Sequence, residues 1–126
     1  MQTLMSFITR FWQETNLPES GAMAFEFSLE ELFTNIFKYG LIADGPSDVR
    51  VSLERLDGVV RMVISDPGPP FDPVAEDAPN LDLSLDEREL GGLGIFLLKE
   101  MMDQITYDRV SDRNVVTLVK SNLCEK

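Results

Sequence analysis

Two turn signals, each lying between apolar segments, constrain the fold of this chain most strongly. Asp57-Gly58 follows Val49, Val51 and Leu53, which alternate with polar residues, and it precedes a second apolar segment. An Asp-Gly pair in this setting is typical of a two-residue hairpin turn. Another pair of apolar segments near the C-terminus surrounds a second turn-like stretch. The chain is therefore predicted to form two hairpins, with strands at 49–54, 59–65, 105–110 and 114–120 and the second turn at 111–113.

Three further segments have helical patterns. Apolar residues recur three or four positions apart over Thr3–Thr15 and again from Ser20 to about Gly40, and a third helix is expected over Ile95–Asp103. The order of elements predicts an α+β fold, a two-layer α/β sandwich whose mixed, mostly antiparallel sheet is covered on one face by helices. The apolar stripes of the first two helices are Leu4, Phe7, Ile8, Phe11 and Trp12, and Phe25, Leu29, Leu32, Phe33 and Ile36.

Length, charge and missing residue types narrow the function. The 126 residues suit a single domain spanning 1–126, and a net charge of −11 argues against binding a nucleic-acid backbone. The chain has no histidine, which excludes histidine bases and most zinc sites, and its one cysteine, Cys124, cannot form an internal disulfide. No apolar stretch approaches the roughly 20 residues that cross a bilayer, and no signal peptide precedes the first helix. We therefore expect a cytoplasmic protein without membrane attachment.

A long loop separates the second predicted strand from the third helix. Pro67–Glu89 contains five of the seven prolines, and residues 72–90 contain seven acidic residues but only one basic residue, Arg88. An acidic run is often only a solvated loop. A loop of this length inside a compact domain is nevertheless usually functional.

The second helix carries an acid and an amide on one face. Glu31 and Asn35 are four residues apart, so their side chains project one turn apart on the same side. An amide oxygen is a suitable ligand for Mg²⁺, and a carboxylate can accept a hydroxyl proton. Glu30 points about 100° away and provides an internal control. Such a pair alone is more often ordinary helix surface.

Two glycine-containing segments suggest a ligand. Asp66 ends the second strand before a glycine–proline turn, where its carboxylate can accept a hydrogen bond from a ligand amine and Gly68 allows close approach. An Asp that only initiates a turn is the common alternative. The run Gly91–Gly94 opens the third helix, where backbone N–H groups and the helix dipole favour a phosphate. Taken alone, a tight loop without a ligand is an equally good explanation of this run.

Together these segments resemble the N, G1 and G2 boxes of Bergerat-fold (GHKL) ATP-binding domains, a superfamily that includes gyrase, histidine kinases and the anti-sigma-factor serine kinases. The matching segments are ELFTNIFKYG (31–40), DPGPPFDP (66–73) and GGLGI (91–95). The resemblance spans roughly residues 3 to 120. The DPGPPFDP variant and the run GGLGIFLLKEMMD (91–103) look most like the anti-sigma-factor serine/threonine kinase branch.

The resemblance implies ATP and Mg²⁺ as cofactors and assigns roles to residues. Asn35 would bind Mg²⁺, and Glu31 would be the catalytic base that takes the proton from a serine or threonine hydroxyl of a partner. Asp66 would accept a hydrogen bond from the adenine amino group, with Gly68 giving room for the base.

The remaining roles also follow from the resemblance. Gly92 and Gly94 would lead the phosphates to the helix N-terminus, and Thr117 would help to hold the adenine. Residues 72–90 would form the lid over ATP, and Arg88, the only cation of this segment, would contact the γ-phosphate. An exposed salt bridge is an equally good explanation for Arg88.

The resemblance thus implies an ATP-dependent serine/threonine kinase that phosphorylates a STAS-domain anti-sigma-factor antagonist in a partner-switching signal transduction system. A sigma factor or another regulatory protein would be a further partner. Family members usually have a strand before the first helix, and here Met1 lies almost directly at that helix, so a homodimer stays an open question. The alternatives are a nucleotide-responsive module that sequesters a partner with little kinase activity, the detached catalytic domain of a histidine kinase, and a small α+β domain with accidental turns.

Overall fold

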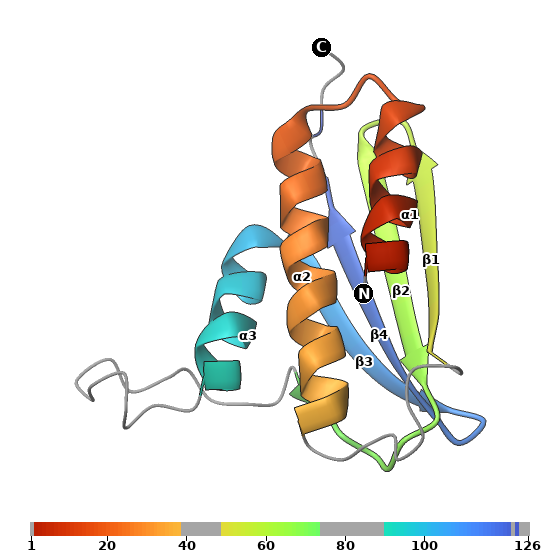
Figure 1. Ribbon diagram of the computed structural model, residues 1–126, viewed down its shortest axis with the longest axis vertical. Coiled ribbons are helices and arrows are strands. Elements are labelled where there is room, and N and C mark those ends of the chain that lie inside the picture. Colours follow the sequence, from red (N-terminus) through yellow and green to blue (C-terminus); the bar gives the residue numbers. More distant parts are fainter. Residues whose placement is uncertain (1, 39–48, 74–89, 122, 124–126) are drawn as a thin grey trace.

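In the computed structural model, the described residues form a four-stranded sheet with three helices on one side of it (Figure 1). The structure describes residues 2–38, 49–73, 90–121 and 123. The helices are α1 (Gln2–Gln13), α2 (Glu19–Lys38) and α3 (Leu90–Met101), and the strands are β1 (Arg50–Leu56), β2 (Val59–Asp66), β3 (Gln104–Val110) and β4 (Arg113–Lys120). The α+β sandwich predicted from the sequence is confirmed.

The sheet has the order β1-β2-β4-β3, and all three strand pairs in the described part of the chain are antiparallel. Both predicted hairpin turns are present. Asp57 in the first turn and Ser111 and Asp112 in the second have positive φ angles of 55°, 50° and 63°. Such angles match the right-handed twist of the strands, which explains the Asp57-Gly58 pair in the first turn.

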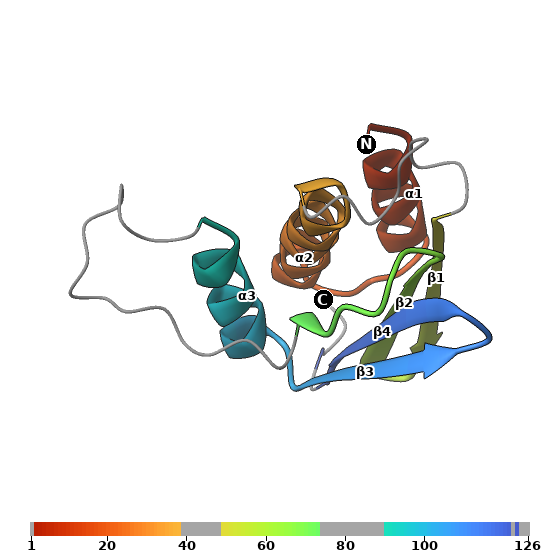
Figure 2. The same ribbon diagram turned by 90° about the horizontal axis from the view of Figure 1, so that it is seen from below.

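The core lies between the sheet and the helices. Seen from below, α1 and α2 lie over the sheet, while α3 lies beside α2 (Figure 2). Residues of the predicted α2 stripe are buried, and so are Ile8 and Trp12 of α1. Phe7, which the helical spacing placed in the α1 stripe, is 42% exposed and lies outside the core. No helix in the described ranges is long and apolar enough to cross a membrane.

The two central strands define the face that α2 covers. In β2, alternate residues from Val60 to Asp66 are buried, and in β4 the buried residues alternate from Asn114 to Leu118. The antiparallel register places Asp66 opposite Asn114 and Met62 opposite Leu118. Because side chains alternate between the faces of a strand, these residues all point toward the helices. Asp66 and Asn114 therefore end the buried face with two polar side chains.

Candidate nucleotide site

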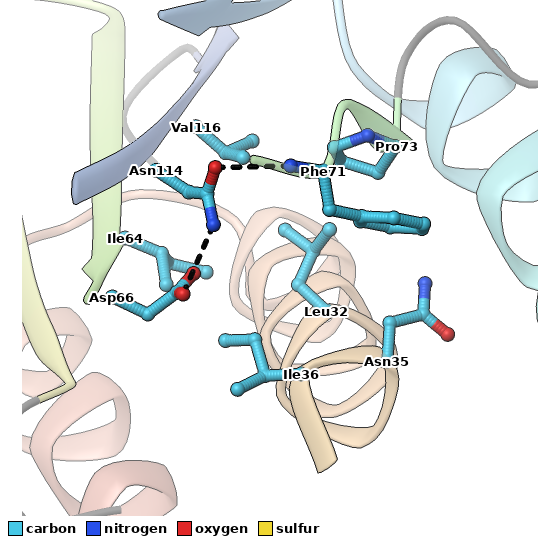
Figure 3. A pocket seen from close by; sticks show the side chains of 9 residues that line it. All are labelled: Leu32, Asn35, Ile36, Ile64, Asp66, Phe71, Pro73, Asn114 and Val116. Atoms are coloured by element: carbon cyan, nitrogen blue, oxygen red, sulfur yellow. Dashed lines mark hydrogen bonds between the residues drawn. The ribbon is translucent and has the colours of Figure 1, made fainter. Parts of the chain in front are cut away.

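Asp66, the last residue of β2, is held by hydrogen bonds at the edge of the core. Its side chain is only 5% exposed. Oδ1 accepts a hydrogen bond from the backbone N–H of Gly68 at 2.9 Å and another from the side-chain amide of Asn114 at 3.1 Å (Figure 3). The first is the local turn contact expected of an Asp two residues before a glycine. The second comes from a different strand and fixes the carboxylate relative to the sheet.

A recess lies between α2 and this end of the sheet. Its cavity has a volume of about 20 Å³, which holds roughly one water molecule. The side chains around it come from α2, β2, the turn after β2 and β4: Leu32, Asn35, Ile36, Ile64, Asp66, Phe71, Pro73, Asn114 and Val116 (Figure 3). A nucleobase is much larger than this cavity, so it can enter only if a covering side chain moves.

Asn35 brings an amide into the recess from α2. The side chain is 4% exposed, and among the described residues nothing donates a hydrogen bond to its Oδ1. A buried oxygen without a partner costs about 1–3 kcal/mol. Amide oxygens are among the ligands that Mg²⁺ accepts, and the ion usually keeps several waters and binds substrate phosphates as well. The unpartnered oxygen therefore fits the predicted Mg²⁺ role of Asn35.

Glu31 lies one helical turn before Asn35 and meets α3. A Cβ atom built on Gly94 would overlap the Glu31 carboxylate, so the two residues are in direct contact. Glu31 is partly buried, whereas Glu30 is exposed. The structure therefore brings the predicted base, and not its neighbour, to the start of α3.

The helix α3 begins earlier than predicted. The expected start was Ile95, but the helix runs from Leu90, so Gly92 and Gly94 lie inside its first turns. Glycine lacks a Cβ and can adopt helical angles, although each glycine costs about 1 kcal/mol relative to alanine. The burial of Ile95, Leu98 and the following Met102 anchors the segment against the core. The N-terminal end of α3 still lies beside Glu31, as the contact with Gly94 shows.

Thr117 does not reach the recess. It pairs with Val63 and Thr106, and it lies one position away from the buried residues Val116 and Leu118. Its side chain consequently points to the face of the sheet that the helices leave open. The sequence did not reveal this orientation because β4 is apolar on both faces.

The polar residue of β4 that does line the recess is Asn114, which was not predicted from the sequence. It is 2% exposed and bonds to Asp66. In the sequence it follows the turn at 111–113 and resembles an ordinary turn residue. The one indication in the sequence that this side chain faces the core is its place near the start of a strand in which Val116 and Leu118, two and four positions after it, are apolar.

Other predicted features fall outside the described residues. Arg88 and residues 74–89 of the predicted lid are among them, and so is Cys124. Gly68, by contrast, is buried directly beside Asp66. The predicted residues Glu31, Asn35, Asp66, Gly68 and Gly94 therefore gather at one end of the molecule.

Comparisons with known proteins give one matching family model and two relatives. The family model described as a histidine kinase-like ATPase domain matches residues 1–120. The chain is 28% identical over 96 residues to the serine/threonine-protein kinase BtrW of Bordetella bronchiseptica, covering 76% of this chain and 68% of the relative. It is 26% identical over 98 residues to the anti-sigma F factor of Geobacillus stearothermophilus, covering 78% and 67%. No solved structure gives a significant match.

Proposed function

The chain belongs to the histidine kinase-like ATPase family, and on that premise we propose that it is an ATP-dependent serine/threonine protein kinase of the anti-sigma-factor type. Its substrate would be a hydroxyl group on a STAS-domain antagonist in a partner-switching system. The names of two relatives, a serine/threonine-protein kinase and an anti-sigma factor, support this choice within the family. A sigma factor or another regulatory protein would be the second partner.

The observation that carries the proposal is the convergence of Glu31, Asn35 and Asp66. Asp66 closes the recess from the sheet, Asn35 enters it from α2, and Glu31 lies one turn away against α3. In the proposal, Asp66 would contact the nucleobase, Asn35 would hold the metal, and Glu31 would act as the base. With Asp66 at the recess and Glu31 beside α3, adenine would lie toward the sheet and the γ-phosphate toward α3.

Each residue has a defined task in the proposed reaction. The Asp66 carboxylate accepts a hydrogen bond from the adenine amino group, and Gly68 leaves space for the ring. Phe71 or Pro73 moves to let the base enter, because the cavity of about 20 Å³ is too small for it. The N-terminus of α3, with Gly92 and Gly94, lies at the phosphates, and Arg88 contacts the γ-phosphate.

Glu31 accepts the proton of the partner's hydroxyl group while the hydroxyl oxygen forms a bond to the γ-phosphorus. The bond from that phosphorus to the bridging oxygen breaks, and ADP leaves. Asn35 would hold Mg²⁺, which neutralises charge on the phosphates when it is bound. Phosphoryl transfer mainly needs positioning and charge neutralisation, and these residues can supply both.

Transfer of labelled γ-phosphate from ATP to STAS-domain proteins of the same organism tests the proposal. Replacement of Glu31 by alanine should lower the rate about 10²–10⁴-fold, the usual contribution of a general base, and should leave ATP binding intact. Glu30→Ala is the matched control, because Glu30 is exposed on the same helix and should be dispensable. Equal losses in both variants would refute the assignment of the base.

The alternative function is a nucleotide-responsive module that sequesters a partner and transfers little phosphate. Both functions require ATP to enter the same recess, so they differ only in whether the γ-phosphate is transferred. ATP binding together with partner binding, but without transfer to any STAS-domain protein, would select this alternative.

A further inference from the structure

Asn114 occupies a central position in the hydrogen bonds around the recess. It starts the buried face of β4, directly opposite Asp66 in the antiparallel register, and it is 2% exposed. The family resemblance gave this residue no role. Its contacts involve the end of β2, the turn that follows it and strand β3.

The amide nitrogen of Asn114 donates to the turn that contains Asp66. Nδ2 lies 3.1 Å from Oδ1 of Asp66 and 2.8 Å from the carbonyl oxygen of Pro69. A longer contact of 3.4 Å reaches the carbonyl of Gly68. The two N–H groups of the amide are therefore fully used, and they fasten the turn at both of its ends.

The amide oxygen of Asn114 accepts hydrogen bonds from the other side. It receives the hydroxyl of Tyr107 at 2.7 Å, the backbone N–H of Phe71 at 3.1 Å and the Arg109 guanidinium at 3.2 Å. Rotating the amide by 180° would set its oxygen against three acceptors and its nitrogen against three donors. The partners therefore fix one orientation of the side chain.

This orientation determines which oxygen of Asp66 remains for a ligand. Oδ1 already accepts bonds from Gly68 and Asn114, whereas among the described residues nothing donates to Oδ2. Asp66 lines the recess. An ionised carboxylate is only an acceptor, so Oδ2 attracts an exocyclic amine and repels a carbonyl oxygen at the same position.

We infer that Asn114 is the positioning residue that fixes Asp66 and thereby sets the preference of the site for adenine over guanine nucleotides. The inference rests on the proposed nucleotide site but not on kinase activity. Adenine presents an amine where guanine presents a carbonyl. Without the Asn114 amide, Asp66 loses a donor from the sheet, and the turn to Phe71 loses two further attachments.

Calorimetric titration of MgATP and MgGTP into the wild type and two variants tests this role. Asn114→Ala removes the amide, and Asn114→Asp keeps the shape but faces Asp66 with an acceptor. Each should lower ATP affinity by about tenfold to a hundredfold, the range for a hydrogen bond to a charged group, with a smaller change for GTP. The ratio of the two affinities should therefore fall.

The ratio of ATP affinity to GTP affinity distinguishes a positioning role from a merely structural one. A loss of stability alone does not change the preference of the folded protein for ATP over GTP. If Asn114→Ala does not fold, the nearly isosteric Asn114→Asp decides. Tyr107→Phe removes one hydrogen bond to the same amide but keeps both donors, so its ratio should stay at the wild-type value.

Two results would count against the inference in different ways. An unchanged ratio in a folded Asn114 variant, with a wild type that prefers ATP, overturns the positioning role and leaves the proposed function standing. A wild type that binds neither nucleotide overturns both.

Discussion

The two ends of the interface between α2 and the sheet bury different kinds of side chain. Toward the start of α2, Phe25 and Leu29 belong to a core that includes Met62 and Leu118, and the Phe25 ring lies 5.8 Å from that of Trp12. Toward its end, the buried polar residues are Asn35, Asp66 and Asn114. In Figure 1 these are the upper and lower ends of the same helix.

The difference shows how one pair of layers serves two purposes. Burying a large apolar side chain contributes about 1.5–3 kcal/mol to stability. Burying a polar atom without a partner costs about 1–3 kcal/mol, as for Oδ1 of Asn35. The stability contributed by the buried apolar side chains therefore offsets the free-energy cost of the buried polar atoms. The polar atoms at the other end can then remain available to bind a ligand. Substitutions at one end should change stability, and those at the other should change binding.

The largest expected effect belongs to the apolar end. Phe25→Ala should lower the free energy of unfolding by about 3–5 kcal/mol, because it leaves a cavity in a fully buried site. Urea denaturation followed by the fluorescence of Trp12 measures this loss. ATP affinity, measured where the variant is still folded, should stay unchanged. Phe25→Leu leaves a smaller cavity and should lose less stability. A tenfold loss of ATP affinity in either folded variant would show that the apolar end also affects binding.

A smaller effect is expected where α3 meets α2. Gly94→Ala would normally stabilise a helix by up to about 1 kcal/mol. Here the added methyl group overlaps the end of the Glu31 side chain, which has to move aside. Because that side chain is flexible, we expect a loss of about 1–2 kcal/mol in a thermal or urea melt, the lower part of the range for overpacking.

A double-mutant cycle provides the control for Gly94. On a Glu31→Ala background the carboxylate is gone, and Gly94→Ala should become neutral or stabilising. Equal destabilisation on both backgrounds would show that Gly94 is needed for a reason other than room for Glu31.

The smallest expected change in stability has the opposite sign. Asn35→Leu replaces an unpartnered buried amide by an apolar side chain and should raise the free energy of unfolding by about 1 kcal/mol. The same variant should lose Mg²⁺-dependent ATP binding. Both are read from a urea melt and a titration of one protein sample.

Ser28→Ala is the matched control for Asn35, because Ser28 is buried on the same helix but its hydroxyl donates to the Ala24 carbonyl at 2.7 Å. That variant should gain no stability and should bind ATP normally. A stabilised Asn35→Leu that still binds MgATP like the wild type would remove Asn35 from the site.

Much of the fold could be predicted because local patterns and tertiary packing agree. The stripe from Phe25 to Ile36 faces the core as its spacing indicated, and Asp57-Gly58 forms the expected turn. The same spacing correctly separated Asn35, which is buried, from the exposed Glu30. Phe7 was misassigned because an apolar residue at helical spacing can still lie at the edge of the buried stripe.

The site was harder to predict where it depends on pairing between distant strands. The faces of β4 cannot be read from its sequence, since Val115, Val116, Leu118 and Val119 occupy both sides. Only the register with β2 shows that Asn114 shares a face with Asp66 and that Thr117 does not. The start of α3 was misjudged for a different reason, because glycine accepts both loop and helical angles and the contact with Glu31 is not local.

The most direct test of the nucleotide site is a calorimetric titration of ATP, with and without Mg²⁺, into the wild type and Asp66→Asn. We expect the wild type to bind ATP more tightly with Mg²⁺ and the variant to lose affinity for ATP much more than for GTP, since the change exchanges an acceptor for an amide at the base. A wild type that binds no ATP, or a variant with equal losses for both nucleotides, would contradict the assignment of this recess as an adenine nucleotide site.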